Sequence, residues 1–313
     1  MTARTQTRIA QSRWALPVTA VYAALVCVAC GAIAQGLWAQ LLLLSASTIL
    51  MAGLNKVHNL VRIYSQIVPC SFLVMTTMSA FLLPSLETAV TQLSLIVFFL
   101  CFFKAYQDPA ATGRMFYAFL ALGIASMAFV QVLFFVPILW ILMATHVLVF
   151  NARTFFATLL GIVAPYWFAM IYYVYVGDVG YFARHFTDLI QIDSVLDLAL
   201  LDEHRVITLV FIFLLAVIGS LHFLIYSYQD KIRTRTIFET FITLDVFCFV
   251  LIVLLPQYFD SLLGMAIVTT APLIGHYSAL SHTKISNISF LAMIAMALII
   301  TAYNLWMPLT IFS

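Results

Sequence analysis

The chain has 313 residues, of which 65% are hydrophobic and 8% are charged, and its net charge is +2. A soluble domain is typically about 45–50% apolar and about 25% charged, so this composition excludes a water-soluble fold. The small net charge, without a stripe of Lys and Arg side chains, also argues against a nucleic-acid partner. The sequence therefore predicts an all-α, polytopic transmembrane helix bundle.

Apolar runs recur from Trp14 to the C-terminus. A hydrocarbon core about 30 Å thick requires around 20 apolar residues in helical conformation. We expect eleven spans, with the N-terminus cytoplasmic and the C-terminus external. They lie at about 15–34, 37–53, 66–83, 89–103, 115–129, 131–150, 155–176, 206–226, 237–255, 261–275 and 288–306. Several are nearer 15 than 20 residues, so these spans would have to tilt or thin the bilayer locally.

The stretch 115–150 carries no charge and leaves two alternatives, one long helix or two spans joined by a tight hairpin near Phe129. The distribution of basic residues bears on this choice, because cytoplasmic loops carry the excess of Lys and Arg. With eleven spans, only Arg184 and Arg205 of the 14 basic residues fall on the external side. One long helix would move the basic cluster at 231–235 outside, so the charge pattern favours the hairpin.

Four parts follow in chain order: a cytoplasmic tail (1–13), spans one to seven (14–176), an external segment (177–205) and spans eight to eleven (206–313). In the external segment, apolar and polar residues alternate at helical spacing. This pattern predicts an interfacial amphipathic helix whose apolar side lies against the outer leaflet or the bundle. We expect the protein in a bacterial inner membrane, in contact with membrane lipids and with other inner-membrane proteins as candidate partners.

The external segment also holds the densest group of polar side chains. The candidate catalytic residues are Asp178, Arg184, His185, Glu203, His204 and Arg205. Carboxylates and His can serve in acid–base catalysis, and Arg can bind the phosphate of a lipid-linked substrate. The alternative is a solvated loop whose charges keep it out of the bilayer. No pattern in the sequence predicts a metal site or a cofactor.

Asp245 lies deep within an apolar run, where a carboxylate without a partner costs roughly 2.5–3.5 kcal/mol. It is a candidate substrate- or proton-binding residue, or else a structural hydrogen-bond acceptor. A pattern of six residues also occurs twice, from Tyr106 to Phe119 and from Tyr228 to Phe241. The repetition indicates either a parallel duplication of four spans, as in some transporters, or the reuse of polar turn residues.

Residues 98–168 contain a short basic loop and then a span with a Gly-x-Ala-Ser element. This element is Gly123, Ile124, Ala125 and Ser126; a Pro-containing span and Arg153 follow it. The stretch resembles a family of uncharacterised bacterial polytopic membrane proteins and, more distantly, the central spans of GT-C membrane glycosyltransferases. In GT-C enzymes the catalytic acids lie in a long first external loop, whereas the corresponding turn here is Gln35 and Gly36. The resemblance therefore implies a related ancestry and assigns no catalytic residue.

Three functions are consistent with these features. The first is a role in cell-envelope assembly, as a lipid-linked glycosyl transferase or polymerase or as a partner of one, and it rests on the GT-C resemblance and the external polar group. The second is a non-catalytic membrane scaffold, favoured by the scarcity of deep polar residues. The third is a proton-coupled transporter, suggested by Asp245 and the repeated pattern. We rank envelope assembly first.

Overall fold

The computed structural model describes residues 5–178, 180–190, 196, 201–281 and 283–311, which form helices and contain no strand. The α-helices are α1 (Thr5–Ala10), α2 (Ala15–Ala29), α3 (Trp38–His58), α4 (Ile67–Met78), α5 (Leu86–Phe102), α6 (Thr112–Ala128), α7 (Val136–Thr145), α8 (Ala152–Val176), α9 (Tyr181–Ile190), α10 (Glu203–Tyr226), α11 (Ile232–Leu254), α12 (Phe259–Leu280) and α13 (Lys284–Ile311). Short 3₁₀ helices are η1 (Ala80–Leu82), η2 (Phe103–Ala105), η3 (Val130–Phe135), η5 (Ser227–Gln229) and η6 (Pro256–Tyr258). The predicted all-helical class is confirmed.

In the part of the chain that the structure describes, seven helices are long and apolar enough to cross a membrane. They are Trp38–His58, Leu86–Ala105, Ala152–Val176, Glu203–Gln229, Ile232–Leu254, Pro256–Leu280 and Lys284–Trp306. Four shorter apolar helices accompany them, at Ala15–Ala29, Ile67–Met78, Thr112–Ala128 and Val130–Thr145. This is the architecture of a multi-pass integral membrane protein.

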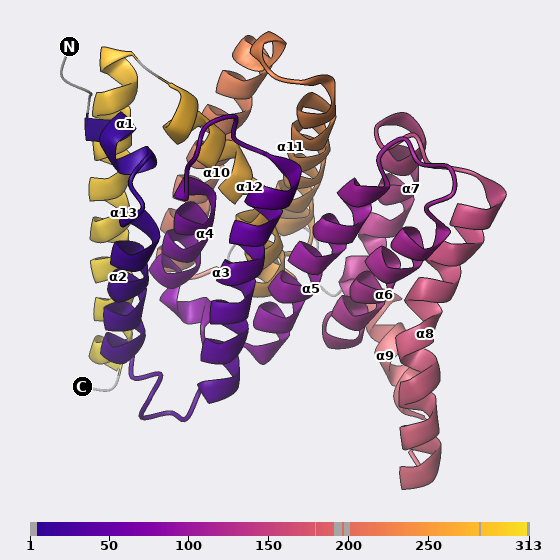
Figure 1. Cartoon of the computed structure of the whole chain (residues 1–313). Coiled ribbons are helices and arrows are strands. Elements are labelled where there is room, and N and C mark those ends of the chain that lie inside the picture. The colour runs from indigo at the N-terminus through magenta and orange to yellow at the C-terminus, as the bar shows by residue number, and fades with distance from the viewer. Residues whose placement is uncertain (1–4, 179, 191–195, 197–200, 282, 312–313) are drawn as a thin grey trace.

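Connections between successive apolar helices lie alternately at the two ends of the bundle, and the two chain termini lie at opposite ends (Figure 1). Helix α1 and the connections α1–α2, α3–α4 and α10–α11 lie at one end of the bundle, at the top of Figure 1. We call it the basic end, because these segments carry Arg8, Arg13, Arg62 and Lys231. Hydrogen bonds hold this end together. The Ser65 hydroxyl donates to the Ala10 carbonyl, and the Gln6 amide donates to the Ser278 carbonyl.

Helix α12 lies at the centre of the bundle and contacts α4, α5, α10 and α11. Every residue of α12 except Asp260 is buried. Two glycines allow this close packing, since a Cβ atom on Gly219 of α10 would lie 2.7 Å from the Leu273 carbonyl carbon, and one on Gly275 would lie 2.7 Å from Val68. The bundle is therefore built around a helix that has almost no contact with lipid.

A pair of glycines also brings α6 and α8 into backbone contact. A Cβ atom on Gly123 would lie 2.7 Å from the Ile162 carbonyl oxygen, and one on Gly161 would lie 2.6 Å from the Phe116 carbonyl oxygen. Close approach of this kind is the usual reason for small residues at membrane helix interfaces. The Gly-x-Ala-Ser element thus has a packing role, with Ser126 donating its hydroxyl to the Gly123 carbonyl.

The stretch 115–150 forms two helices, as the charge pattern favours. The α-helical hydrogen bonding ends at Phe129, which has extended dihedral angles (φ −139°, ψ 97°), and η3 and α7 follow. The end of α7 returns to the start of α6, where the Gln107 N–H donates to the Val147 carbonyl at 2.9 Å. Pro137 falls in the first turn of α7, where its missing N–H costs no helical hydrogen bond.

The amphipathic helix expected in the external segment corresponds to α9, and its apolar side packs against the bundle. Phe182 and Phe186 contact the Tyr166 ring of α8, and Tyr181 stacks on Tyr173 with ring centroids 3.9 Å apart. These aromatic contacts place α9 alongside the end of α8 (Figure 1). Three further residues of the predicted amphipathic pattern, Gln191, Ser194 and Val195, lie outside the described residues.

Candidate functional site

The predicted catalytic residues fall into two groups, and the first lies where α8 meets α9. Arg184 donates from Nη2 to both carboxylate oxygens of Asp178, at 2.8 and 2.6 Å. The pair is open to solvent, with 66% of the Arg184 side chain and 43% of the Asp178 side chain exposed. An exposed ion pair of this kind contributes little stability, so both side chains are available to a ligand.

His185 points from α9 towards the end of α6. Its Nε2 lies 3.0 Å from the Ser126 carbonyl oxygen and 3.4 Å from the Tyr166 hydroxyl. Because a carbonyl can only accept, the contact with Ser126 favours the tautomer with a proton on Nε2. On the same helix, a hydrogen bond with Tyr173 and partial burial raise the pKa of Tyr181 to about 12, which keeps its phenol neutral.

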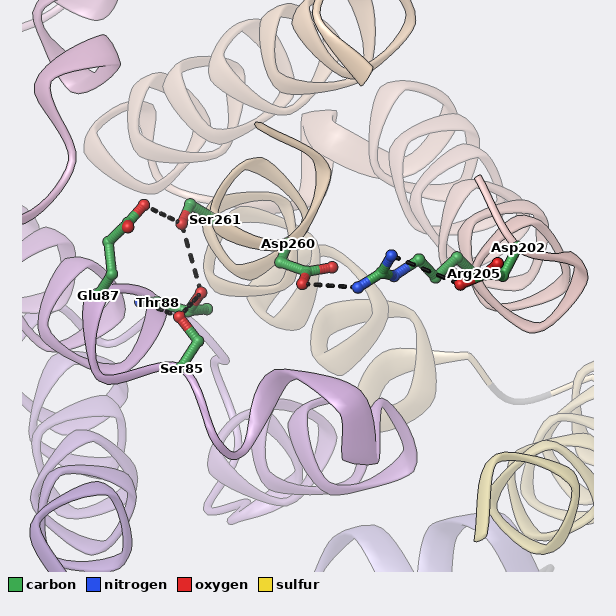
Figure 2. Close-up of polar contacts among 7 residues, drawn as sticks. All are labelled: Ser85, Glu87, Thr88, Asp202, Arg205, Asp260 and Ser261. Carbon is green, nitrogen blue, oxygen red and sulfur yellow. Dashed lines mark hydrogen bonds and ion pairs between the residues drawn. The ribbon is translucent and has the colours of Figure 1, made fainter. Parts of the chain in front are cut away.

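The second group lies at the start of α10, where Arg205 binds two carboxylates from different segments (Figure 2). Its Nη2 donates to Asp260 Oδ2 at 3.0 Å, and its Nη1 lies 3.6 Å from Asp202 Oδ2. The guanidinium also lies over the Phe81 ring, 5.6 Å from the centroid. Arg205 therefore fixes the start of α10 against the start of α12.

The other two predicted residues of this group differ in their surroundings. His204 packs its ring edge against Phe81, with centroids 5.4 Å apart, and Glu203 is exposed in the first turn of α10. A carboxylate in that position is stabilised by the partial positive charge of the helix N-terminus. The Glu203 carboxylate is therefore accessible for acid–base chemistry.

Sequence reasoning missed a hydrogen-bonded network next to this group. The Ser261 hydroxyl donates to Glu87 Oε1 at 2.6 Å and lies 3.3 Å from the Thr88 hydroxyl, which bonds Ser85. Figure 2 shows Ser261 and Asp260 pointing to opposite sides of α12, towards α5 and α10 respectively. The acidic residues at the starts of α5 and α12, Glu87 and Asp260, are visible in the sequence. The sequence does not show that these two helix starts lie close together.

Asp245 is 2% exposed on α11 and is hydrogen bonded to the central helix. The hydroxyls of Thr269 and Thr270 both donate to its Oδ1, at 2.7 and 2.9 Å. In both contacts Asp245 is a structural hydrogen-bond acceptor, which is one of the two roles that the sequence suggests for it. A proton- or substrate-binding role for Asp245 stays a prediction, and the residue lines neither of the cavities described next.

An apolar cavity of about 470 Å³ lies between α2, α4, α10, α12 and α13. Its lining includes Ile9, Ser12, Trp14, Tyr22, Met75, Phe211, Ile274, Ser278, Phe290 and Ala297. None of the predicted external site residues contributes to it. We refer to it as the apolar cavity.

A second cavity, of about 260 Å³, lies at the basic end and is lined mainly by polar side chains. Its lining combines Arg62 from the connection after α3 with residues of α10, α12 and the connections that follow these helices. We refer to it as the polar cavity. No pattern in the sequence brings His222 together with Arg62.

These groups can supply general acids, general bases and phosphate-binding cations at both ends of the bundle. Among the residues that the structure describes, no cluster of three or more His, Cys, Asp or Glu side chains could hold a metal ion. Comparison of the chain with protein-family models, with curated proteins and with solved structures finds no match.

Proposed function

We propose that the chain crosses a bacterial inner membrane eleven times, and that it binds an amphipathic lipid used in the assembly of cell-envelope glycans. The eleven apolar helices and the alternation of their connections support the span count. The concentration of Lys and Arg at one end supports a cytoplasmic N-terminus and an external C-terminus. The four helices that are shorter than about 20 residues then require local thinning of the bilayer.

The apolar cavity carries the proposal of a lipid ligand. Ligand pockets in proteins typically have volumes of about 300–1,000 Å³. The volume of the apolar cavity, about 470 Å³, falls within this range. Its wall is formed almost wholly by aliphatic and aromatic side chains. A hydrocarbon chain is the occupant that such a wall favours.

The position of the apolar cavity indicates where the head of that lipid would lie. Ile9, Ser12 and Trp14 extend the wall to the basic end of the bundle. Arg8 and Arg13 are neighbours of these residues in the sequence, and both side chains are exposed. Basic side chains at the membrane surface attract anionic lipid heads. A lipid-linked sugar carries its sugar on a phosphate or a pyrophosphate, so its tail suits the cavity and its head suits these arginines.

Filling the cavity provides a direct test. Ala297 lines it and is 7% exposed, whereas Ala302 lies on the same helix and faces outwards. We expect Ala297→Phe to lose a co-purifying phosphorylated lipid, measured by native mass spectrometry, and to lose surface glycan in cells. Ala302→Phe, the matched control, should retain both. Wild-type lipid and wild-type glycan in Ala297→Phe would contradict the proposal.

The six external residues lie at the opposite end of the bundle from Arg8 and Arg13, so any chemistry that they perform would act on a sugar presented at the external face and not on the head of the lipid in the cavity. Combining Arg184→Ala, His185→Ala and Glu203→Ala in the glycan assay separates binding from reaction, since the lipid should then still co-purify while the glycan is lost. A scaffold role is the second candidate, favoured by the exposed aromatic side chains Trp167, Phe168 and Tyr175 on α8. A stoichiometric protein partner that survives Ala297→Phe would favour the scaffold.

A further inference from the structure

The polar cavity and the apolar cavity lie on opposite sides of α12. Ile274 and Ser278 line the apolar cavity, whereas His276 and Leu280 line the polar one. Residues two positions apart on an α-helix point about 200° apart, so the central helix separates the two spaces. The polar cavity is therefore a distinct site, and its ligand need not be the lipid proposed above.

One wall of the polar cavity is formed by Arg62 and the connection between α10 and α11. Arg62 donates from Nη2 to Gln229 Oε1 at 2.7 Å and from Nη1 to the Gln229 carbonyl at 3.3 Å. The Arg62 side chain is exposed, so the cavity is accessible from the basic end. These hydrogen bonds fix the guanidinium at the rim of the cavity.

The deeper wall contains two histidines and a carboxylate. His276 donates from Nε2 to Asp230 Oδ2 at 3.0 Å, and only 1% of the His276 side chain and 4% of the Asp230 side chain are exposed. The ring of His222 lies beside that of His276, with centroids 5.7 Å apart. Within the described part of the chain, Nδ1 of each histidine is buried without a hydrogen-bond partner. Buried polar atoms of this kind are rare and call for an explanation.

The charges and donors in the cavity select the class of ligand. Among the described residues, Asp230 is the only carboxylate that lines it, and this carboxylate already accepts a hydrogen bond from His276. The side chains of Arg62, His222, Tyr226 and Thr283 can all donate hydrogen bonds. A cation would find no free acid there, whereas a phosphate would find a guanidinium, an imidazole and hydroxyl groups, which are its usual partners in proteins.

We propose that the polar cavity binds a phosphate group that enters from the basic end, which is the cytoplasmic end in the eleven-span topology. Two sources share this chemistry, a free phosphate compound and the head of an anionic lipid. Both can be offered to the purified protein in nanodiscs, one as inorganic pyrophosphate in solution and the other as phosphatidic acid in the membrane.

The experiment compares four variants with the wild type in phosphatidylcholine nanodiscs. Isothermal titration should show saturable pyrophosphate binding to the wild type, weakened about tenfold or more in Arg62→Met and in His222→Phe, because each loses a charged or polar donor. Arg62→Lys should bind with intermediate affinity. The matched control is Arg114→Met, since Arg114 lies exposed at the same end, pairs with Asp108 and does not line the cavity.

Phosphatidic acid nanodiscs form the second arm, read by native mass spectrometry as retained lipid. If lipid retention depends on Arg62 and pyrophosphate does not bind, the phosphate belongs to a lipid head. If pyrophosphate binds and lipid retention does not depend on Arg62, the phosphate belongs to a free ligand. If Arg62→Met unfolds, His222→Phe still tests the proposal, because a phenyl ring preserves the packing of the imidazole. Absence of binding in both arms, or wild-type binding by Arg62→Met and His222→Phe, would overturn the proposal.

Discussion

Replacing His276 with alanine is expected to destabilise the folded bundle by about 1–3 kcal/mol, because the Asp230 carboxylate, whose side chain is 4% exposed, loses its hydrogen-bond donor. Water in the polar cavity can replace part of that hydrogen bond, since both side chains line the cavity. The contact joins the connection after α10 to the central helix, so the loss should reduce global stability. Unfolding by SDS titration of the protein in mixed micelles, followed by circular dichroism, measures the change.

The repeated sequence pattern supplies the control for this prediction. Asp108 occupies the position equivalent to Asp230, but its partner is Arg114, and the two side chains are 39% and 51% exposed. Asp108→Asn should therefore change the stability by only about 0–1 kcal/mol. A His276→Ala variant that is as stable as Asp108→Asn would show that the buried pair does not hold the bundle together.

Gly161→Ala should destabilise the protein by about 1–3 kcal/mol, because the added methyl group overlaps backbone on the facing helix. Its carbon would lie 2.6 Å from the Phe116 carbonyl oxygen, so α6 and α8 would have to separate. Backbone cannot adopt another rotamer to relieve this overlap, as a flexible side chain could. The same SDS titration measures the loss.

Gly113→Ala is the matched control, since Gly113 lies on α6 and a Cβ atom there meets nothing within 4 Å. Alanine has a higher helix propensity than glycine, so this variant should be as stable as the wild type or slightly more stable. Equal losses in Gly113→Ala and Gly161→Ala would mean that loss of glycine itself, rather than contact between the two helices, determines the stability.

The apolar runs of the sequence located each apolar helix but underestimated the length of the central one. The sequence predicts a span at 261–275, whereas α12 together with η6 covers Pro256–Leu280. Asp260 and His276 lie near its ends and suggest an interface when only hydropathy is considered. In the structure their charge or polarity is matched by Arg205 and Asp230, so the helix continues inside the protein. Such partners cannot be deduced from local composition.

The candidate site shows the same limit. The Asp178–Arg184 pair involves residues six positions apart, and the sequence already places them in one group. Arg205, in contrast, pairs with Asp260, which is 55 positions away, and the polar cavity draws on Arg62, His222 and His276 from three different helical hairpins. Only the packing of the helices brings these residues together.

The eleven-span topology is the claim on which both the orientation of the cavities and the cytoplasmic entry of phosphate depend. A phosphatase reporter that is active only outside the cytoplasm, fused after residue 313, measures it directly. The eleven-span topology predicts high phosphatase activity for this fusion and none for a fusion at Arg235. An inactive C-terminal fusion, in a protein that still accumulates in the membrane, would contradict the odd number of crossings.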